Sequence, residues 1–402
     1  MTVAEEARPD AARARFSGTP VIIGLIGFLT LVDLFAAQAI LPSLAARFNA
    51  TPAQIGFAAN ASTIGMAAAG LLMAFIGGRF NRKIAVWVSL AVLSIPTVLL
   101  SFAPDLSTFM ALRIVQGVFM VAAFSMTMSY LAERCSAAQS ATALAAYVTG
   151  VVASNLVGRL VAGLVTDAYG VSVNFYFFAA LNLAGAVLAF FALKNAQPMA
   201  GAGAMSHSPL AVMAGHLRNR CLLASFGIGF LILFAFIGVF TYVNFVLARA
   251  PISLSPMSLG LVYFVFVPSM LTTPIAGKLS AKYGARLSFY ASLGLALAAL
   301  PLLLSTALPA ILIGLALVGV GTFFAQATAT GFVGRAAKTD RAAASGMYLS
   351  SYYLGGLAGS FMLGKIFEAQ GWAATVVIVA VSIVLAALLA TILKKSTAEP
   401  AR

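Results

Sequence analysis

Long apolar runs alternate with short polar segments along almost the whole chain. A membrane-spanning helix needs about 20 mostly apolar residues, whereas a strand of a membrane barrel needs only about 10. Twelve runs reach the helical length, and a helix in lipid satisfies its own backbone hydrogen bonds. The pattern therefore predicts twelve spanning helices over residues 20–42, 54–77, 84–103, 109–132, 141–166, 175–194, 221–248, 257–280, 287–306, 309–334, 343–367 and 373–393.

The polar segments divide this array into two equal parts. The longest segment, residues 195–220, is rich in Gly, Ala, Ser and His and predicts a flexible linker that ends in a short surface helix. A six-helix half over 20–194 precedes it, and a second six-helix half over 221–393 follows it. Residues 1–19 and 394–402 are predicted to be polar tails, and the first tail lacks the apolar core of a signal peptide.

The composition excludes most soluble classes of protein. The chain is 62% hydrophobic and 8% charged, with a mean hydropathy of +1.02, whereas an average soluble domain is about 25% charged. So few charges cannot cover a water-soluble surface, which excludes a soluble enzyme and a disordered tail protein. The net charge of +14 is scattered between apolar runs, so it does not predict nucleic-acid binding.

The positive charges predict the orientation in the membrane. Nineteen of the 24 Lys and Arg residues lie in the tails, the linker and one alternating set of connectors, and three (Arg47, Arg249 and Lys365) lie in the other set. Positive residues are retained on the cytoplasmic side. We therefore expect a multi-pass protein of a bacterial-type inner (plasma) membrane, with both termini on the cytoplasmic side.

The two halves repeat each other. The segment 78–83 and the segment 281–286 share a small–cation–aromatic–turn pattern at an offset of 203 residues. At an offset of 201, Gly158, Gly163, Asp167 and Gly170 align with Gly359, Gly364, Glu368 and Gly371. Two parallel six-helix repeats around a central site are typical of secondary transporters.

These residues resemble the major facilitator superfamily over nearly the whole chain. The first short loop is similar to its Gly-x-Leu-x-Asp-Arg-x-Gly-Arg-Lys motif, although Gly78 replaces the acid, and Ala281 replaces it in the second copy. In that family the loop acts as a cytoplasmic latch between the halves, so the missing acids put its ion pair in doubt, and Glu133 becomes a candidate partner for Arg79 or Arg82. The predicted gate residues are Arg79, Arg82, Lys83, Glu133, Lys282 and Arg286.

Further motifs resemble one branch of that superfamily. Arg113-x-x-Gln116-Gly117 is similar to the Arg-x-x-Gln-Gly motif of proton-coupled members. Gly158-Arg159-x-x-x-Gly163 and the segment 348–356 are similar to the YnfM-like branch, which is grouped with drug:proton antiporters and arabinose-efflux-like permeases. The resemblance implies an all-α integral membrane protein with two pseudo-symmetric six-helix halves.

Three ionisable residues lie inside predicted spans, where a charge costs about 2.5–3.5 kcal/mol on insertion scales. They are Asp33 in the first span, Arg113 in the fourth and Arg159 in the fifth, and Asp33 is the only one of the 10 acids well inside a span. At about 1.5 Å rise per residue, their depths from the outer span ends differ by only about 5 Å. We therefore expect that they can form one buried cluster.

The chemistry of this cluster leaves three alternatives open. Arginine keeps its proton, burial disfavours a charged carboxylate, and a neighbouring arginine favours it. Asp33 could therefore change protonation with substrate or water, as proton coupling requires. Alternatively, the cluster is a static ion pair that orients the first and fourth spans, or Arg113 holds an anionic substrate directly.

The substrate cavity is predicted from polar and aromatic residues within the spans. In the resembled fold the first, fourth, seventh and tenth spans line the cavity, which favours the amides among the candidates. An aromatic wall with few fixed charges suits a moderately apolar organic substrate, whereas ordinary helix packing is the alternative for each aromatic residue. The candidates are Gln38, Gln116, Asn244 and Gln326, together with Tyr242, Tyr263, Phe266, Tyr352 and Tyr353.

Several functions are excluded by missing motifs. The sequence has no Walker-type phosphate loop, its two Cys and two His residues form no metal-ligand pattern, and no Ser/His/Asp set is available. We therefore expect no cofactor, no metal and no enzymatic activity. The predicted partners are a small-molecule substrate, protons and membrane lipid, without nucleic acid, and the predicted state is a monomer.

The prediction is a secondary transporter that works by alternating access and exports a small organic or drug-like compound against inward proton flow. Proton-linked uptake of a small organic anion, held by Arg113 and Arg159, is the first alternative. A membrane sensor that has lost transport is the second, and the missing loop acids are its only support.

Overall fold

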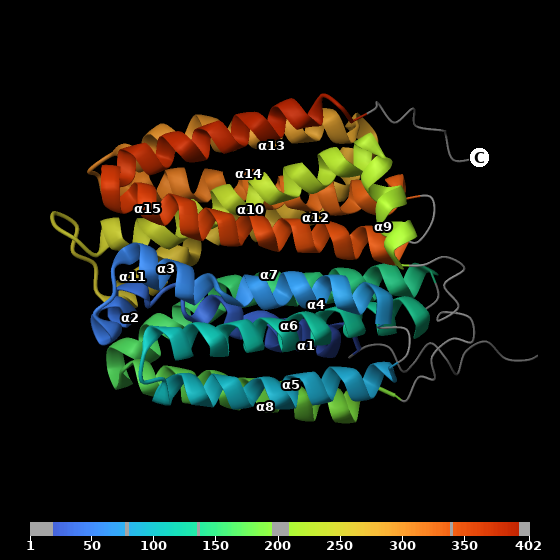
Figure 1. The fold of residues 1–402 in the computed structure, drawn as a ribbon, viewed down its shortest axis with the longest axis horizontal. Helices are drawn as coiled ribbons and strands as arrows, with labels where there is room; N and C mark the ends of the chain where they lie inside the picture. The colour runs from blue at the N-terminus through green and yellow to red at the C-terminus, as the bar shows by residue number, and fades with distance from the viewer. Residues whose placement is uncertain (1–18, 77–79, 135–136, 195–208, 338–340, 394–402) are drawn as a thin grey trace, which may run out of the picture.

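The computed structural model describes residues 19–76, 80–134, 137–194, 209–337 and 341–393. Within these ranges the chain forms helices joined by turns, and no strand occurs. The helices run side by side along one axis (Figure 1). The first half consists of α1 (Thr19–Ala36), α2 (Leu41–Phe48), α3 (Pro52–Asn60), α4 (Ser62–Ile76), α5 (Arg82–Leu99), α6 (Leu106–Arg134), α7 (Ala137–Tyr169) and α8 (Val171–Ala192).

The second half follows the predicted linker, of which residues 195–208 lie outside the described ranges. The predicted surface helix is α9, which also buries Val212 and His216. Short 3-10 turns follow α5, α11 and α13. The helices from the linker onward are α9 (Pro209–Arg218), α10 (Arg220–Leu247), α11 (Pro256–Val262), α12 (Val267–Tyr283), α13 (Ala285–Ala299), α14 (Leu308–Ala336) and α15 (Arg341–Ala390).

The helices account for the twelve predicted spans. Ten helices of the described chain are long and apolar enough to cross a membrane. The apolar part of α1, Pro20–Phe35, is a shorter apolar helix at the position of the first predicted span. The 50-residue α15 is interrupted at Gly371, and Figure 1 shows its two parts running in opposite directions. The fold is therefore an all-α membrane protein of twelve spans.

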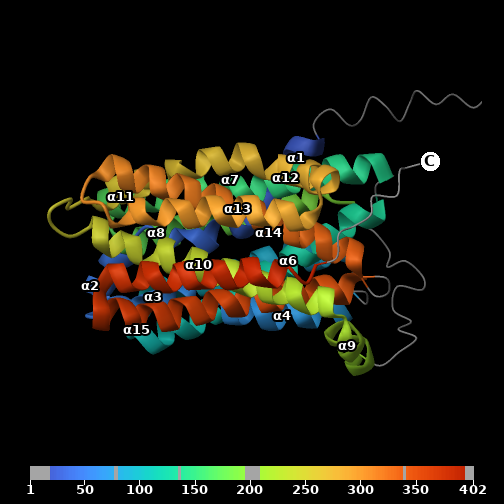
Figure 2. The ribbon, with the colours of Figure 1, turned by 90° about the horizontal axis from the view of Figure 1, so that it is seen from above.

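The two halves form two layers. In Figure 1 the helices from α1 to α8, coloured blue to green, lie mostly below the helices from α9 to α15, coloured yellow-green to red, and the short α11 lies at the level of α3. Figure 2 shows the same bundle from above, with α2 and α9 at opposite ends. We call these ends the α2 end and the α9 end.

Two predicted spans are broken inside the bundle, which the apolar pattern did not predict. The first span ends as α1 at Ala36, and a turn leads to α2 at Leu41. The second span is broken between α3 and α4, next to Asn60. The last carbonyls of a helix lack partners within that helix. Local turn bonds satisfy Phe35 O and Ala58 O, whereas Leu34 O and Ala59 O accept from elsewhere in the bundle.

The repeat predicted at an offset of 201 residues has a structural counterpart. Gly170 joins α7 to α8 with φ 86°, and Gly371 joins the two parts of α15 with φ 80°. This left-handed conformation favours glycine, because it has no Cβ. Both hairpins lie at the α2 end and turn the chain back into the membrane (Figure 1).

Equivalent glycines also bring the halves together. A Cβ on Gly163 of α7 would lie 2.7 Å from the carbonyl oxygen of Pro256, the first residue of α11. A Cβ on Gly364 of α15 would lie 3.0 Å from the Cα of Ala53, near the start of α3. Each half therefore presents one glycine of the repeat to a short helix of the other half, and both contacts lie towards the α2 end.

Candidate functional site

Asp33 lies on α1 with 1% of its surface exposed. Its Oδ2 accepts hydrogen bonds from Thr97 Oγ1 at 2.7 Å, from Gln116 Nε2 at 2.7 Å and from Asn182 Nδ2 at 3.2 Å. These donors come from α5, α6 and α8. The other carboxyl oxygen, Oδ1, is buried without a hydrogen-bond partner. The carboxyl group is thus held through one oxygen, which leaves the other as a position for a proton.

The Thr97 hydroxyl can adapt to either the charged or the protonated form of the Asp33 carboxyl group. Its hydroxyl lies 2.7 Å from Asp33 Oδ2 and 2.8 Å from the carbonyl oxygen of Leu93. A hydroxyl has one hydrogen to donate. It can therefore turn between the carboxylate and the helix carbonyl without leaving the site.

Arg113 on α6 does not bind the Asp33 carboxylate directly; its guanidinium donates to backbone carbonyls at the two helix breaks. The acceptors are Asp33 O at 3.5 Å and Leu34 O at 3.2 Å in the last turn of α1, and Ala59 O at 3.0 Å in the last turn of α3. A further bond reaches Ser62 Oγ at 3.3 Å, at the start of α4. Arg113 therefore caps two helix C-termini, where a positive charge is stabilising.

Gln116 joins the two charged residues. Its Oε1 accepts from Arg113 Nη1 at 2.7 Å, and its Nε2 donates to Asp33 Oδ2 at 2.7 Å. Only this amide orientation satisfies both neighbours, because a guanidinium only donates and a carboxylate accepts. The two charges predicted to meet are therefore linked through an amide. Gln116, predicted to line the cavity, belongs to this buried polar group.

Arg159 on α7 lies in a different environment, and its exposed fraction is 0%. It donates to Gln38 Oε1 and, at 3.3 Å, to the carbonyl oxygen of Asn155. Its guanidinium carbon lies 4.4 Å from the ring centre of Tyr263, 4.7 Å from that of Phe35 and 5.0 Å from that of Phe266. Cation–π attraction to rings partly offsets the burial of its charge. We call Arg159 and these three rings the arginine box.

A chain of hydrogen bonds runs from the arginine box to the second half. Gln38, in the turn after α1, accepts from Arg159 and donates to Asn60 Oδ1 at 2.9 Å. Asn60 in turn donates to Thr241 Oγ1 on α10 at 3.2 Å. Among the described residues, the hydrogen bonds of Arg159 do not reach Asp33, so the three predicted charges form two neighbouring polar groups instead of one cluster.

The predicted residues of the second half occupy three environments. Asn244 and the hydroxyl of Tyr263 are 2.8 Å apart, beside the arginine box. Tyr242 donates to the carbonyl oxygen of Ser360 and stacks on Phe367, so it packs α10 against α15.

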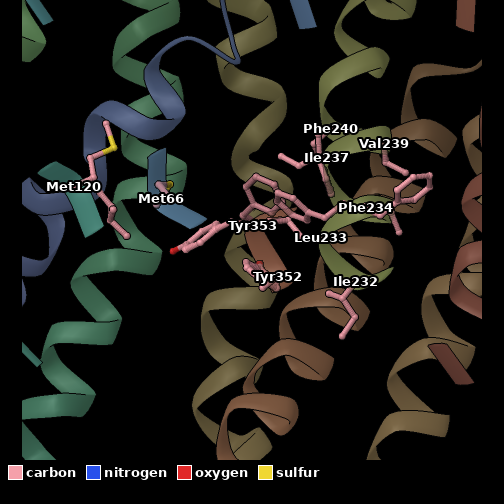
Figure 3. Packing of buried hydrophobic residues seen from close by; sticks show 14 of the residues in the cluster. Met66, Met120, Ile232, Leu233, Phe234, Ile237, Val239, Phe240, Tyr352 and Tyr353 are labelled. Atoms are coloured by element: carbon pink, nitrogen blue, oxygen red, sulfur yellow. The ribbon is translucent and has the colours of Figure 1, made fainter. Parts of the chain in front are cut away.

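The remaining candidates lie on α14 and α15. Gln326 on α14 is half-buried, whereas Tyr352 and Tyr353 are each 8% exposed. Figure 3 shows Tyr353 extending towards Met66 and Met120 of the first half. Tyr353 is therefore a contact between the halves.

Four phenylalanines form an aromatic group next to the arginine box. Phe266 belongs to both: its ring centre lies 4.7 Å from Phe240, 5.8 Å from Phe236 and 5.5 Å from Phe323. These residues come from α10, α14 and the turn between α11 and α12. The result is an apolar surface adjoining a buried cation.

The predicted gate loops are only partly described. Arg79 and the side chain of Glu133 lie outside the described residues. Arg82 is buried and contacts Met126 Sδ at 3.6 Å, and Lys83 lies 4.9 Å from the ring centre of Phe190. In the second copy of the loop, the side chains contact nearby tyrosines: Lys282 lies 5.0 Å from the ring of Tyr283, and Arg286 donates to Tyr290 at 3.2 Å.

Among the residues of the site that were not predicted from the sequence are Thr97, Asn182 and Asn60. All three are buried. Asn182 and Asn60 are amides within predicted spans, where an unpaired polar group is costly, so their polarity at membrane depth was an available signal. Thr97 carried no such signal, because a threonine within a helix commonly satisfies its hydroxyl by bonding to a carbonyl of its own helix.

Sequence comparison identifies relatives along most of the chain. A family model described as Major Facilitator Superfamily matches residues 23–266 and 249–402. The "Uncharacterized MFS-type transporter YybF" of Bacillus subtilis (strain 168) is 25% identical over 319 residues, which cover 79% of each chain. The "Inner membrane transport protein YnfM" of Escherichia coli (strain K12) is 26% identical over 310 residues, 77% of this chain and 74% of that protein.

Solved structures share the arrangement of helices. A bacterial homolog of the human lysosomal transporter Spinster, in an inward-facing and occupied conformation, superimposes with a TM-score of 0.75 at 14% identity and covers 93% of this chain and 96% of its own. A mutant of the nucleoside transporter NupG gives a TM-score of 0.72 at 14% identity, with 94% and 99% covered. At these identities the likeness shows the fold alone.

Proposed function

The chain belongs to the Major Facilitator Superfamily, and from this premise we propose that it is a proton-coupled secondary transporter of a small organic compound. In this proposal Asp33 carries the proton. The two halves move relative to each other and open the centre of the bundle to one side of the membrane at a time. In this proposal the α9 end faces the cytoplasm and both termini are cytoplasmic, as the distribution of Lys and Arg favours.

The observation that carries the proposal is the environment of Asp33. A residue that couples transport to protons must be stable in both protonation states. The neutral donors Thr97, Gln116 and Asn182 stabilise the carboxylate, and the unpartnered Oδ1 can accept a proton. Thr97 can turn its hydroxyl to Leu93 O when the carboxyl group is neutral.

The position of Arg113 supports this interpretation over a static ion pair. A static pair would place the guanidinium on the carboxylate, usually through two parallel bonds. Here Arg113 instead caps α1 and α3, and its hydrogen bonds reach the Asp33 carboxylate only through Gln116. Protonation of Asp33 would therefore leave the bonds from Arg113 to both helix ends intact.

The aromatic group defined above supports a substrate with a substantial apolar part. The resemblance to drug:proton antiporters favours export against inward proton flow. Proton-linked uptake of a small organic anion is the second candidate, and the buried cation of Arg159 is the observation that favours it.

The proposal is tested with purified protein in liposomes that contain a pH-sensitive dye. A panel of organic cations, neutral compounds and anions is added under an imposed pH gradient, with wild type, Asp33→Asn and the control Asp167→Asn, whose side chain is exposed. We expect at least one compound to dissipate the gradient with wild type and the control but not with Asp33→Asn. Equal dissipation with all three proteins would contradict coupling through Asp33.

The same liposomes distinguish export from uptake. With a labelled compound, antiport moves the label opposite to the protons, whereas symport moves it with them. Movement opposite to the protons supports export, and movement with them supports uptake.

A further inference from the structure

We propose that the arginine box is an anion-binding site, which takes the negative charge of a small amphipathic carboxylate during transport. This inference rests on the proposed function as a transporter, and it defines the substrate class of the same central region. The site joins Arg159 and Phe35 of the first half to Tyr263 and Phe266 of the second.

The first argument is the unused hydrogen-bonding capacity of Arg159. A guanidinium has five N–H donors. The structure gives Arg159 two acceptors, Gln38 and the Asn155 carbonyl, and leaves its Nε buried without a partner. Arg113, by comparison, has five acceptors. Arg113 is therefore saturated by the protein, whereas Arg159 retains donors for a ligand.

The second argument is charge. Arg159 is fully buried, and its partners among the described residues are an amide oxygen, a carbonyl oxygen and three rings. A buried cation without a counter-charge is costly, and an anion that pairs with it in good geometry offsets part of that cost. Asp33 is bonded to other residues, and Asp105, Asp167 and Glu368 are the other acids whose side chains the structure describes. A ligand is thus a natural source for the missing negative charge.

The third argument is the position between the halves. Arg159 is four residues from Gly163, where α7 meets α11 at close range. Two rings of the box belong to the half that moves relative to Arg159 in alternating access. When the halves separate, the box opens and exposes the guanidinium, and when they close, both halves enclose the bound group.

The surroundings define the chemistry of the ligand. A planar guanidinium matches a carboxylate, which can accept two parallel hydrogen bonds. Phe236, Phe240 and Phe323 adjoin Phe266 and can cover an apolar body. Among the described residues, the buried Lys and Arg side chains are Arg113, Arg159 and Arg82, and Arg82 lies near the α9 end, away from the arginine box. The site therefore fits one negative charge and an apolar body rather than a dicarboxylate.

The test measures ligand-induced thermal stabilisation of the purified protein, because a bound ligand raises the melting temperature by mass action. The probes are matched pairs that differ in charge: phenylacetate with phenylacetamide, and octanoate with octanamide. Tetraphenylphosphonium is the cationic probe. The proteins are wild type, Arg159→Gln, Arg159→Lys and the control Arg249→Gln, at an exposed arginine of the α2 end.

We expect at least one carboxylate to stabilise wild type and Arg249→Gln, whereas its amide and the cation do not. Loss of the charge-assisted bonds should weaken carboxylate binding by about tenfold or more in Arg159→Gln, and Arg159→Lys should recover part of it. Equal stabilisation by the amide, no stabilisation of wild type by either carboxylate, or unchanged affinity in Arg159→Gln would overturn the proposal.

Two further measurements keep the result decisive. If Arg159→Gln does not fold, modification of wild-type Arg159 by phenylglyoxal is followed by mass spectrometry; protection by the carboxylate supports the site, and its absence overturns it. Asp33→Asn should retain the carboxylate response and lose proton-driven transport. Failure of the anion site and failure of proton coupling through Asp33 are therefore observed separately.

Discussion

Replacing Arg113 alone is expected to destabilise the protein more than replacing Arg113 and Asp33 together. In Arg113→Met the buried carboxylate remains, while Gln116 loses the cation on its other side. The carbonyls of Leu34 and Ala59 also lose a donor. Removing one partner of a buried charge pair costs about 3–5 kcal/mol, so we expect a loss of that order in the free energy of unfolding.

The double variant Asp33→Asn/Arg113→Met separates the charge from the helix caps. The lost caps, at about 0.5–1.5 kcal/mol for each neutral hydrogen bond, are common to both variants and cancel in the comparison. Replacing Asp33 removes the uncompensated carboxylate, which accounts for most of the cost of about 3–5 kcal/mol. It also removes the charge-assisted hydrogen bonds of that carboxylate, which contribute about 1.5–3 kcal/mol. The double variant should therefore be about 2 kcal/mol more stable than Arg113→Met.

Unfolding by sodium dodecyl sulfate in mixed micelles, followed by circular dichroism, measures this difference. The single variants, the double variant and wild type form a complete cycle. If the double variant is no more stable than Arg113→Met, the two charges are not coupled through Gln116, and the interpretation of this group is wrong.

Three further predictions follow from single contacts. Thr97→Val keeps the shape of the side chain but removes the donor to Asp33, so proton-driven transport should fall while unfolding changes by only about 1–3 kcal/mol; unchanged transport would exclude a role for this hydroxyl. Gly163→Val should slow transport because a Cβ at this position meets the Pro256 carbonyl. Gly294→Val should not slow transport, because a Cβ at Gly294 meets open space. Equal transport rates for the two variants would show that the close approach of α7 and α11 is dispensable. The Glu368 carboxylate accepts a hydrogen bond from the Ala53 backbone amide at 2.7 Å, which joins α15 to the start of α3 across the two halves. Glu368→Ala should therefore favour opening of the α2 end, measured as a longer distance between spin labels on α3 and α15. An unchanged distance distribution would contradict this.

The fold was predictable because membrane crossing imposes one strong requirement on the sequence. Each span needs a long apolar run, and these runs are visible without knowledge of their partners. The repeat was also visible, and Gly170 and Gly371 share the same conformation. What the runs could not show is a break inside an apolar segment, because Ala36 to Leu41 remains apolar enough to read as helix.

The buried charged residues of the candidate site were visible in the sequence, but their connections were not. The cost of charges in lipid identified Asp33, Arg113 and Arg159. Their grouping depends on helix rotation and on the two breaks, which place free carbonyls in front of Arg113. Similar depth from the span ends could not distinguish one cluster from two, because depth does not fix which way a side chain points around its helix.

The most direct test of proton coupling compares two modes of transport by the same protein in the same liposomes. Exchange of labelled for unlabelled substrate at equal pH requires only that the halves alternate, whereas accumulation driven by a pH gradient also requires a proton carrier. We predict that Asp33→Asn retains exchange and loses gradient-driven accumulation, while Asp167→Asn retains both. If Asp33→Asn retains both modes, or loses both while remaining folded, Asp33 is not the residue that couples protons to transport.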